Sequence, residues 1–144
     1  MAGISDWPFR KICTALGADF TVTEMISADP KFRDTSRNAL RLDLKDVPID
    51  DFFNDDVDYY QKISGGLPDE KANSSREPKI VQIAGAAPEL LIDAAKMAVD
   101  FGAEVVDINM GCPAKKVCKQ LAGSALMKDE PLVAQLLEAV VKAE

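Results

Sequence analysis

A cysteine and a run of polar side chains near position 110 have the composition of a reactive site. The stretch from Asp107 to Val117 reads as a strand that enters a Gly-Cys-Pro turn and continues into two lysines. Cys112 supplies a thiol, and Lys115 and Lys116 follow it as cations, which favour the thiolate form of a neighbouring cysteine. A small buried cysteine in a tight turn, followed by two solvated lysines, explains the same residues equally well.

Two segments of strand-like apolar character carry polar side chains. The run from 105 to 110 is β-branched and apolar, yet Asp107 and Asn109 fall on one of its faces because side chains alternate along a strand. Gln82 interrupts the apolar run from 79 to 85 in a similar way. A polar group inside a buried strand needs a hydrogen-bond partner. A bound ligand is one such partner, so these three residues join the cysteine as site candidates.

The elements that must position these residues alternate along the chain. Apolar spacing, with proline or capping residues at the start, predicts helices at 6–16, 88–101 and 131–141. β-branched and apolar runs predict strands at 20–25, 79–85 and 104–110. A weaker helical pattern covers 29–40. This order predicts an α/β protein with a parallel sheet and helical crossovers.

The positions of two further side chains in these elements bear on their burial. Cys13 falls on the apolar face of the first helix and is predicted to be a core residue. Glu24 stands near the end of the first strand, where a solvated loop residue and a polar group facing the interior both fit the pattern.

The candidate residues gather toward one edge of the predicted sheet. In parallel α/β folds the ligand lies at the carboxyl ends of the strands, and in a (β/α)8 barrel the loops there carry the chemistry. Gln82, Asp107 and Asn109 lie toward those ends, and Cys112 follows directly. A closed barrel takes at least about 200 residues. A chain of 144 residues with three clear strands is therefore expected to form only part of one.

The formal net charge of −7 belongs to a single stretch of the chain. Between Leu42 and Glu70 nine acidic residues stand against two lysines, a surplus equal to the whole net charge. An acidic balance argues against nucleic acid as a partner, but here that argument applies to one segment. We interpret residues 42–78 as an insertion, because they are too many for an ordinary connection. Its four paired aromatics either bind another protein or fold back onto the domain.

Composition also limits the site chemistry and the location. No signal peptide or membrane-spanning run is recognisable, which predicts a cytoplasmic protein without a membrane partner. An organellar location stays open because the first residues look like the end of a strand whose start is missing. Three cysteines at these spacings match no disulfide or zinc pattern, and there is no histidine. We therefore expect no metal site and no histidine base in this chain.

Several segments of the chain resemble the tRNA-dihydrouridine synthases, most closely the bacterial type-B branch. The matching segments are MAGISDWPFR at 1–10, TVTEM at 21–25, VQIAG at 81–85, DINMGCPAKKV at 107–117 and LAGSAL at 121–126. The run at 107–117 is the most specific of them. Together the matches span almost the whole chain except the acidic segment 42–78.

The resemblance implies an FMN-dependent (β/α)8 barrel that reduces the 5,6 double bond of selected uridines in tRNA, with NADPH as the reductant. Residues 1–144 would form the N-terminal part of that barrel, with the end of strand 1 and roughly strands 2–4 with their helices. The acidic insertion lies at about 42–78. The C-terminal half-barrel and a helical tRNA-binding domain would be absent, so we expect the isolated chain to bind FMN weakly or not at all.

The resemblance also assigns roles to individual residues of the flavin and uracil sites. Carried over by position, Met1 and Ala2 lie against the flavin, and Gln82 hydrogen-bonds its isoalloxazine ring. Asn109 orients the flipped-out uracil, and Cys112 is the proton donor. This division is chemically consistent, because hydride addition at C6 leaves carbanionic character at C5 that needs a proton.

The lysines and the overall function keep alternatives. Lys115 and Lys116 either contact substrate phosphate or tune the thiol, and a solvated basic turn fits them as well. A second enzyme reading is another FMN-dependent barrel that acts on a free pyrimidine, as a dihydroorotate dehydrogenase does. A non-enzyme reading is an inactive fragment that works as an interaction module through unpaired strand edges and its acidic insertion.

Overall fold

A computed structural model describes residues 3–33, 41, 44 and 77–143 of the chain. The expectations for Met1, Ala2 and nearly all of the acidic segment 42–78 therefore lie outside the described residues, as does the end of the weak helical pattern at 29–40. In the part that the structure describes, no helix is long and apolar enough to cross a membrane.

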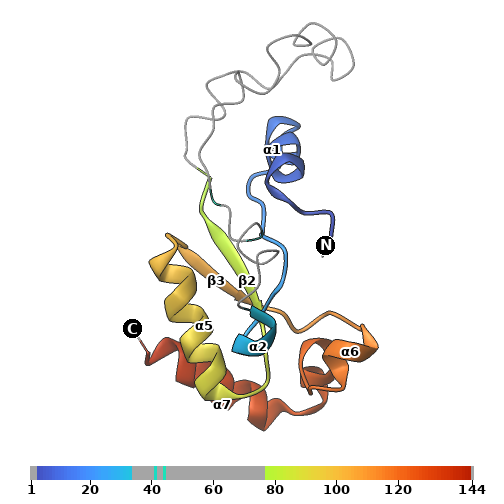
Figure 1. Cartoon of the computed structure of the whole chain (residues 1–144), viewed down its shortest axis with the longest axis vertical. Helices are drawn as coiled ribbons and strands as arrows, with labels where there is room; N and C mark the ends of the chain where they lie inside the picture. The colour runs from blue at the N-terminus through green and yellow to red at the C-terminus, as the bar shows by residue number, and fades with distance from the viewer. Residues whose placement is uncertain (1–2, 34–40, 42–43, 45–76, 144) are drawn as a thin grey trace, which may run out of the picture.

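The described residues form a three-stranded parallel sheet (Figure 1). It consists of β1 (Ile26–Ser27), β2 (Ile80–Ala84) and β3 (Val105–Ile108), in the order β1-β2-β3. β2 lies in the middle and pairs in parallel with both neighbours. This confirms the predicted parallel α/β arrangement and puts the carboxyl ends of all three strands at one edge of the sheet.

The first strand is shorter and later than the sequence predicts. A strand was expected at 20–25, but Val22 makes only an isolated bridge to Ile80, and β1 begins at Ile26. The reason lies in the side chain of Thr23, whose hydroxyl oxygen accepts the backbone N–H of Gln82 at 3.0 Å. A side chain thus takes the place of a backbone carbonyl, and the regular ladder is interrupted at this point.

Helix α1 (Trp7–Ala15) confirms the first predicted helix but corrects the role of Cys13. Asp6 caps it by accepting the backbone N–H of Phe9 at 3.1 Å. Cys13 is only half-buried, and Phe9 and Leu16 on the same apolar stripe are 38% and 60% exposed. Figure 1 shows α1 beyond the amino end of β2, away from the layer formed by α5 and α7. The stripe therefore does not face the core.

The core lies between the sheet and two long helices, α5 (Pro88–Asp100) and α7 (Glu130–Val141). α5 packs against β2, β3 and α7. Its buried stripe consists of Leu91 and three alanines, as predicted, and the small side chains let the helix approach the sheet closely. The fully buried large side chains are Ile26, Val81, Ile83, Leu91, Leu126 and Leu136.

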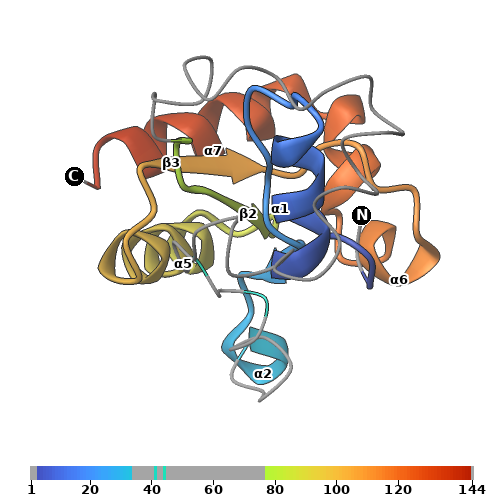
Figure 2. The same ribbon diagram turned by 90° about the horizontal axis from the view of Figure 1, so that it is seen from above.

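Three short elements stand near the carboxyl edge of the sheet. α2 (Pro30–Arg33) is a single turn after β1. The segment after β3, which was expected to be a loop, contains α6 (Lys115–Cys118) and the 3-10 helix η2 (Gly123–Lys128). In Figures 1 and 2 α6 and α5 lie on opposite sides of β2.

Candidate active site

Gln82 on the central strand β2 and Asp107 on the neighbouring strand β3 face each other across the sheet. The parallel register places them directly opposite each other on β2 and β3. Gln82 Nε2 donates a hydrogen bond to Asp107 Oδ2 at 2.6 Å. Both side chains are half-buried. The structure therefore explains how two polar residues are accommodated in apolar strands: they satisfy each other.

Asn109 connects this pair to the cysteine turn. Its Nδ2 donates to Gln82 Oε1 at 2.9 Å, while its Oδ1 accepts the backbone N–H of Cys112 at 3.0 Å and that of Gly111 at 3.3 Å. An asparagine side chain that bonds the backbone two and three residues ahead fixes a tight turn. One side chain therefore couples the strand network to the main chain that carries the thiol.

Cys112 is half-buried, and its thiol has no hydrogen-bond partner among the described residues. The turn holds the backbone of Cys112 and leaves its sulfur free. The sequence predicts Gln82, Asn109 and Cys112 at one edge of the sheet, and the structure brings these three into one connected group.

The two lysines lie outside that group, on the exposed surface of α6. Lys116 Nζ stands 5.1 Å from the centroid of the Phe32 ring on α2, a cation-π distance. Lys115 has no such contact in the described part of the chain. Both remain close in sequence to Cys112, but the structure shows no bond from either lysine to the thiol.

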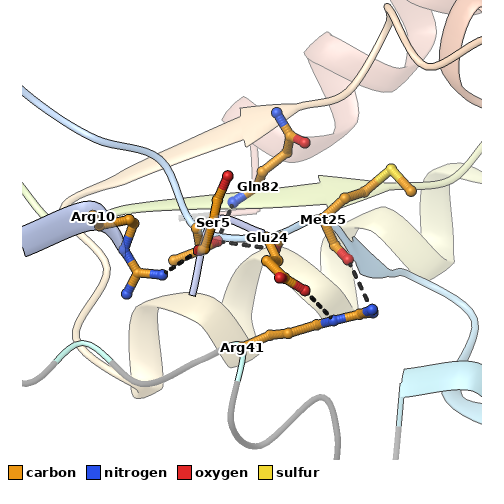
Figure 3. Close-up of polar contacts among 7 residues, drawn as sticks. Ser5, Arg10, Glu24, Met25, Arg41 and Gln82 are labelled. Atoms are coloured by element: carbon orange, nitrogen blue, oxygen red, sulfur yellow. Dashed lines mark hydrogen bonds and ion pairs between the residues drawn. The ribbon is translucent and has the colours of Figure 1, made fainter. Parts of the chain in front are cut away.

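A second polar cluster stands beside the first and was not anticipated in full (Figure 3). Glu24 is buried and its Oε2 accepts a hydrogen bond from Arg41 Nε at 2.7 Å, which also makes an ion pair. Arg41 Nη1 reaches the carbonyl of Met25 at 3.4 Å. The solvated-loop reading of Glu24 is therefore wrong. Its partner is 17 residues away, so no local pattern could have revealed the pair.

Thr23 joins the two clusters through the backbone. Its hydroxyl accepts from the N–H of Gln82 and donates to the carbonyl of Glu24 at 3.1 Å. In Figure 3 the Gln82 amide and the Glu24 carboxylate point to opposite sides of the sheet. The strands therefore present two polar faces, one toward Asp107 and Cys112 and one toward Arg41.

The described residues also line a shallow cavity between α1 and the start of β2. Its wall includes Trp7, Arg10, Thr21 and Glu77. Glu77 closes one side by accepting hydrogen bonds from the Thr14 hydroxyl at 2.9 Å and from the Thr21 N–H at 2.7 Å. This cavity lies at the amino end of β2, whereas the convergent polar groups lie at the carboxyl end. We place the candidate site by its chemistry, at the carboxyl edge.

Comparison with known proteins gives a consistent result along the whole chain. The model of the dihydrouridine synthase (Dus) family matches residues 1–144. A tRNA-dihydrouridine synthase B of Pseudomonas aeruginosa is 43% identical over 143 residues, and one of Xanthomonas campestris pv. campestris is 46% identical over 143. One of Shewanella oneidensis is 42% identical over 144 residues.

These alignments cover 99% of this chain but only 35% or 36% of each relative. The chain thus spans about a third of the length of the curated relatives it matches. Its match to the family model includes the strand ends, the asparagine and the cysteine turn described above. The chain belongs to the dihydrouridine synthase family, and its relatives place it with the type-B branch.

Proposed function

We propose that this chain supplies one side of the active site of an FMN-dependent enzyme that reduces uridine in tRNA to 5,6-dihydrouridine, with NADPH as the reductant. The observation that carries the proposal is the hydrogen-bonded path from Gln82 through Asn109 to the backbone of Cys112, at the carboxyl edge of a parallel sheet. The names of the relatives support the reaction and the tRNA substrate. They favour it over the oxidation or reduction of a free pyrimidine.

In this proposal the three-stranded unit is the N-terminal part of a (β/α)8 barrel. The parallel order β1-β2-β3 with α5 as a crossover between β2 and β3 fits such a barrel. Residues 1–144 supply the end of strand 1 and roughly strands 2–4, and residues 42–78 form an insertion. The chain spans about a third of the relatives' length, which leaves room for the remaining strands and a helical tRNA-binding domain. The enzyme acts in the cytoplasm.

The donor set of Gln82 fits a flavin ring. An amide nitrogen carries two N–H groups, and Gln82 Nε2 uses one of them on Asp107. The other has no partner among the described residues, and it can donate to a carbonyl oxygen or ring nitrogen of FMN. Met1 and Ala2 lie against the same ring in this proposal. A bound FMN supplies the hydride that adds to C6 of the uracil.

Asn109 and Cys112 act on the substrate. The uracil must leave the RNA stack to be reached at all, and the remaining Nδ2 hydrogen of Asn109 can donate to one of its carbonyl oxygens. The Cys112 thiol gives its proton to C5, the C5–H bond forms, and the resulting thiolate takes a proton from water. Lys115 and Lys116, exposed on α6, contact the phosphates that flank the base.

The decisive experiment removes the thiol in a full-length enzyme that carries these residues. Cys112→Ala is expected to leave the rate of FMN reduction by NADPH within about twofold of the parent. Hydride transfer from NADPH to FMN does not involve protonation of uracil C5. Dihydrouridine formation is expected to fall by about 100-fold to 10⁴-fold, the range typical of the loss of a general acid. Stopped-flow flavin absorbance and dihydrouridine analysis of the tRNA measure the two steps.

The matched control is Cys13→Ala, which removes a half-buried thiol from α1 at the other end of the sheet. It should change neither step. Equal loss of both half-reactions in Cys112→Ala, with Cys13→Ala unaffected, contradicts the proton-donor role.

A further inference from the structure

A second thiol, Cys118, stands directly behind the turn that carries Cys112. Its Sγ donates to the carbonyl oxygen of Cys112 at 3.5 Å, and the backbone N–H of Ser124 donates to that same oxygen at 3.0 Å. Cys118 Sγ also lies 3.4 Å from Ser124 Oγ. Two separate elements, α6 and η2, therefore converge on one peptide carbonyl.

The direction of these bonds follows from the groups themselves. A carbonyl oxygen only accepts, so the single S–H proton of Cys118 points at Cys112. The bond between Cys118 and Ser124 must then use the Ser124 hydroxyl as its donor. The result is a short chain from the serine hydroxyl through the second thiol to the catalytic residue's main chain.

Gly123 lets η2 come this close. Its φ of +64° lies in the left-handed region, and a Cβ added there would stand 2.5 Å from the Cys112 carbonyl oxygen and 2.9 Å from Val117 Cγ1. Real Cβ atoms do not approach backbone oxygen so closely. Leu121 also has a positive φ, of 59°. The chain is turned back sharply here, at a cost in backbone strain, to place residues 123 and 124 against the cysteine turn.

Both backbone polar groups of Cys112, its N–H and its carbonyl, are consequently held by hydrogen bonds. Asn109 accepts its N–H at 3.0 Å, while Ser124 and Cys118 bond its carbonyl. None of these contacts involves the Cys112 sulfur. A backbone fixed on both sides with a free side-chain sulfur is the arrangement that proton transfer requires, because the donor must be held within hydrogen-bond reach of the acceptor carbon.

We propose that Cys118, Gly123 and Ser124 are positioning residues that aim the Cys112 thiol at C5 of the uracil. The proposal rests on the proposed function, because it concerns the geometry of that proton transfer. It assigns a role to the helical segment after the cysteine turn and makes the second thiol a structural donor instead of a reactant.

The test uses a full-length enzyme that carries these residues and measures FMN reduction and dihydrouridine formation separately. Gly123→Ala must displace the Cys112 carbonyl, and a misplacement of about 1 Å costs on the order of 100-fold in rate. We expect that loss in kcat for dihydrouridine formation, with FMN reduction and KM for tRNA within about twofold. The matched control is Gly102→Ala, since Gly102 also has a positive φ, of 94°, but has no atom within 4 Å of the added Cβ.

The cysteine variants test the hydrogen bond itself. Cys118→Ala loses the donor and is expected to slow dihydrouridine formation by about fivefold, the effect of one net hydrogen bond. Cys118→Ser retains a donor and should restore most of that rate, which a purely volumetric effect would not do. Ser124→Ala should have the smallest effect, because its backbone N–H still bonds the Cys112 carbonyl.

The outcomes separate this proposal from the proposed function. If Cys112→Ala leaves dihydrouridine formation intact, the proposed function fails. If Cys112→Ala stops the reaction while Gly123→Ala and Cys118→Ala match the parent, only the positioning role is overturned. If Gly123→Ala does not fold, the two variants of Cys118 provide the test. Equal rates of dihydrouridine formation for Cys118→Ala and the parent overturn the proposal, whereas a lower rate in Cys118→Ala that Cys118→Ser restores supports it.

Discussion

Two polar clusters occupy opposite faces of the same sheet, and they differ in how completely their hydrogen bonds are used. On one face Gln82 and Asn109 each spend one amide N–H on a neighbour and keep another unused among the described residues, beside a free thiol. On the other face Glu24 is closed off by Arg41, with side chains 7% and 24% exposed. The first cluster has capacity to bind a ligand, whereas the second is satisfied within the chain.

Burial of a charge alone does not locate an active site. Glu24 is more deeply buried than Asp107. Its partner Arg41 also bonds the carbonyl of Met25, so the ion pair attaches Arg41 to the residues just before β1. Asp107 is only half-buried but stands in the group that leads to Cys112. Unused hydrogen-bonding capacity is the better guide to the position of the site. It predicts that substitutions in the first cluster lower the reaction rate, whereas substitutions in the second lower the stability.

Among the changes that compare the two clusters, the largest effect is expected from Asn109→Leu, because Asn109 links the two parts of the first cluster. Asn109→Leu removes the acceptor of the Cys112 N–H and the donor to Gln82 together. In a full-length enzyme that carries these residues, we expect dihydrouridine formation to fall by on the order of 100-fold, because the proposed proton donor is no longer held in place. The melting temperature should change little, since water can replace these half-exposed bonds. A large drop in melting temperature with unchanged kcat would show that Asn109 contributes to stability and not to the reaction.

Arg41→Met is expected to show the opposite behaviour. It leaves the buried Glu24 carboxylate without its ion-pair partner, which costs about 3 kcal/mol of unfolding free energy. Glu24→Met should cost less, because the Arg41 side chain is more exposed and can turn into solvent. Urea denaturation of both variants measures the asymmetry. In a full-length enzyme that carries these residues, rates of dihydrouridine formation by the folded fraction should stay near those of the parent. A loss of rate without loss of stability would place this pair in the active site.

Gln82→Leu tests the proposed contact to the flavin. Loss of one hydrogen bond to the ring, about 1.4 kcal/mol, corresponds to about a tenfold weaker affinity for FMN. Equilibrium dialysis of the full-length variant measures it. Thr23→Val is the matched control, because the Thr23 hydroxyl bonds the backbone of Gln82 and of Glu24 and makes no bond to the Gln82 side-chain amide. Unchanged FMN affinity in Gln82→Leu would exclude this contact.

The smallest effect concerns the lysines on α6. Lys115→Ala should weaken tRNA binding by only a few-fold and lower the slope of log affinity against log salt by about one. Lys116→Ala should do the same and also lose a cation-π contact worth about 0.5 to 1 kcal/mol. Filter binding at several salt concentrations distinguishes a phosphate contact from a solvated turn, for which neither affinity nor slope changes.

Short-range patterns predicted much of this molecule. The alternation of helices and strands, the alanine stripe of α5 and the gathering of Gln82, Asp107 and Asn109 at one edge all follow from local periodicity and from the shared direction of parallel strands. Cys13 was misjudged because periodicity gives the apolar face of a helix but not what that face packs against. The interrupted first strand escaped prediction because a threonine hydroxyl replaced a backbone acceptor.

Local patterns and motifs were enough to predict the parallel α/β class, the family, and Cys112 with its polar neighbours as the candidate site. How those neighbours are connected became visible only in the folded chain. Asn109 joins two strands and a turn, Glu24 finds Arg41, and Gly123 allows η2 to hold the Cys112 carbonyl. The physical reason is that such contacts depend on distances between residues that share no local pattern. A side chain's type shows which bonds it can make, and folding decides which of them are left for a ligand.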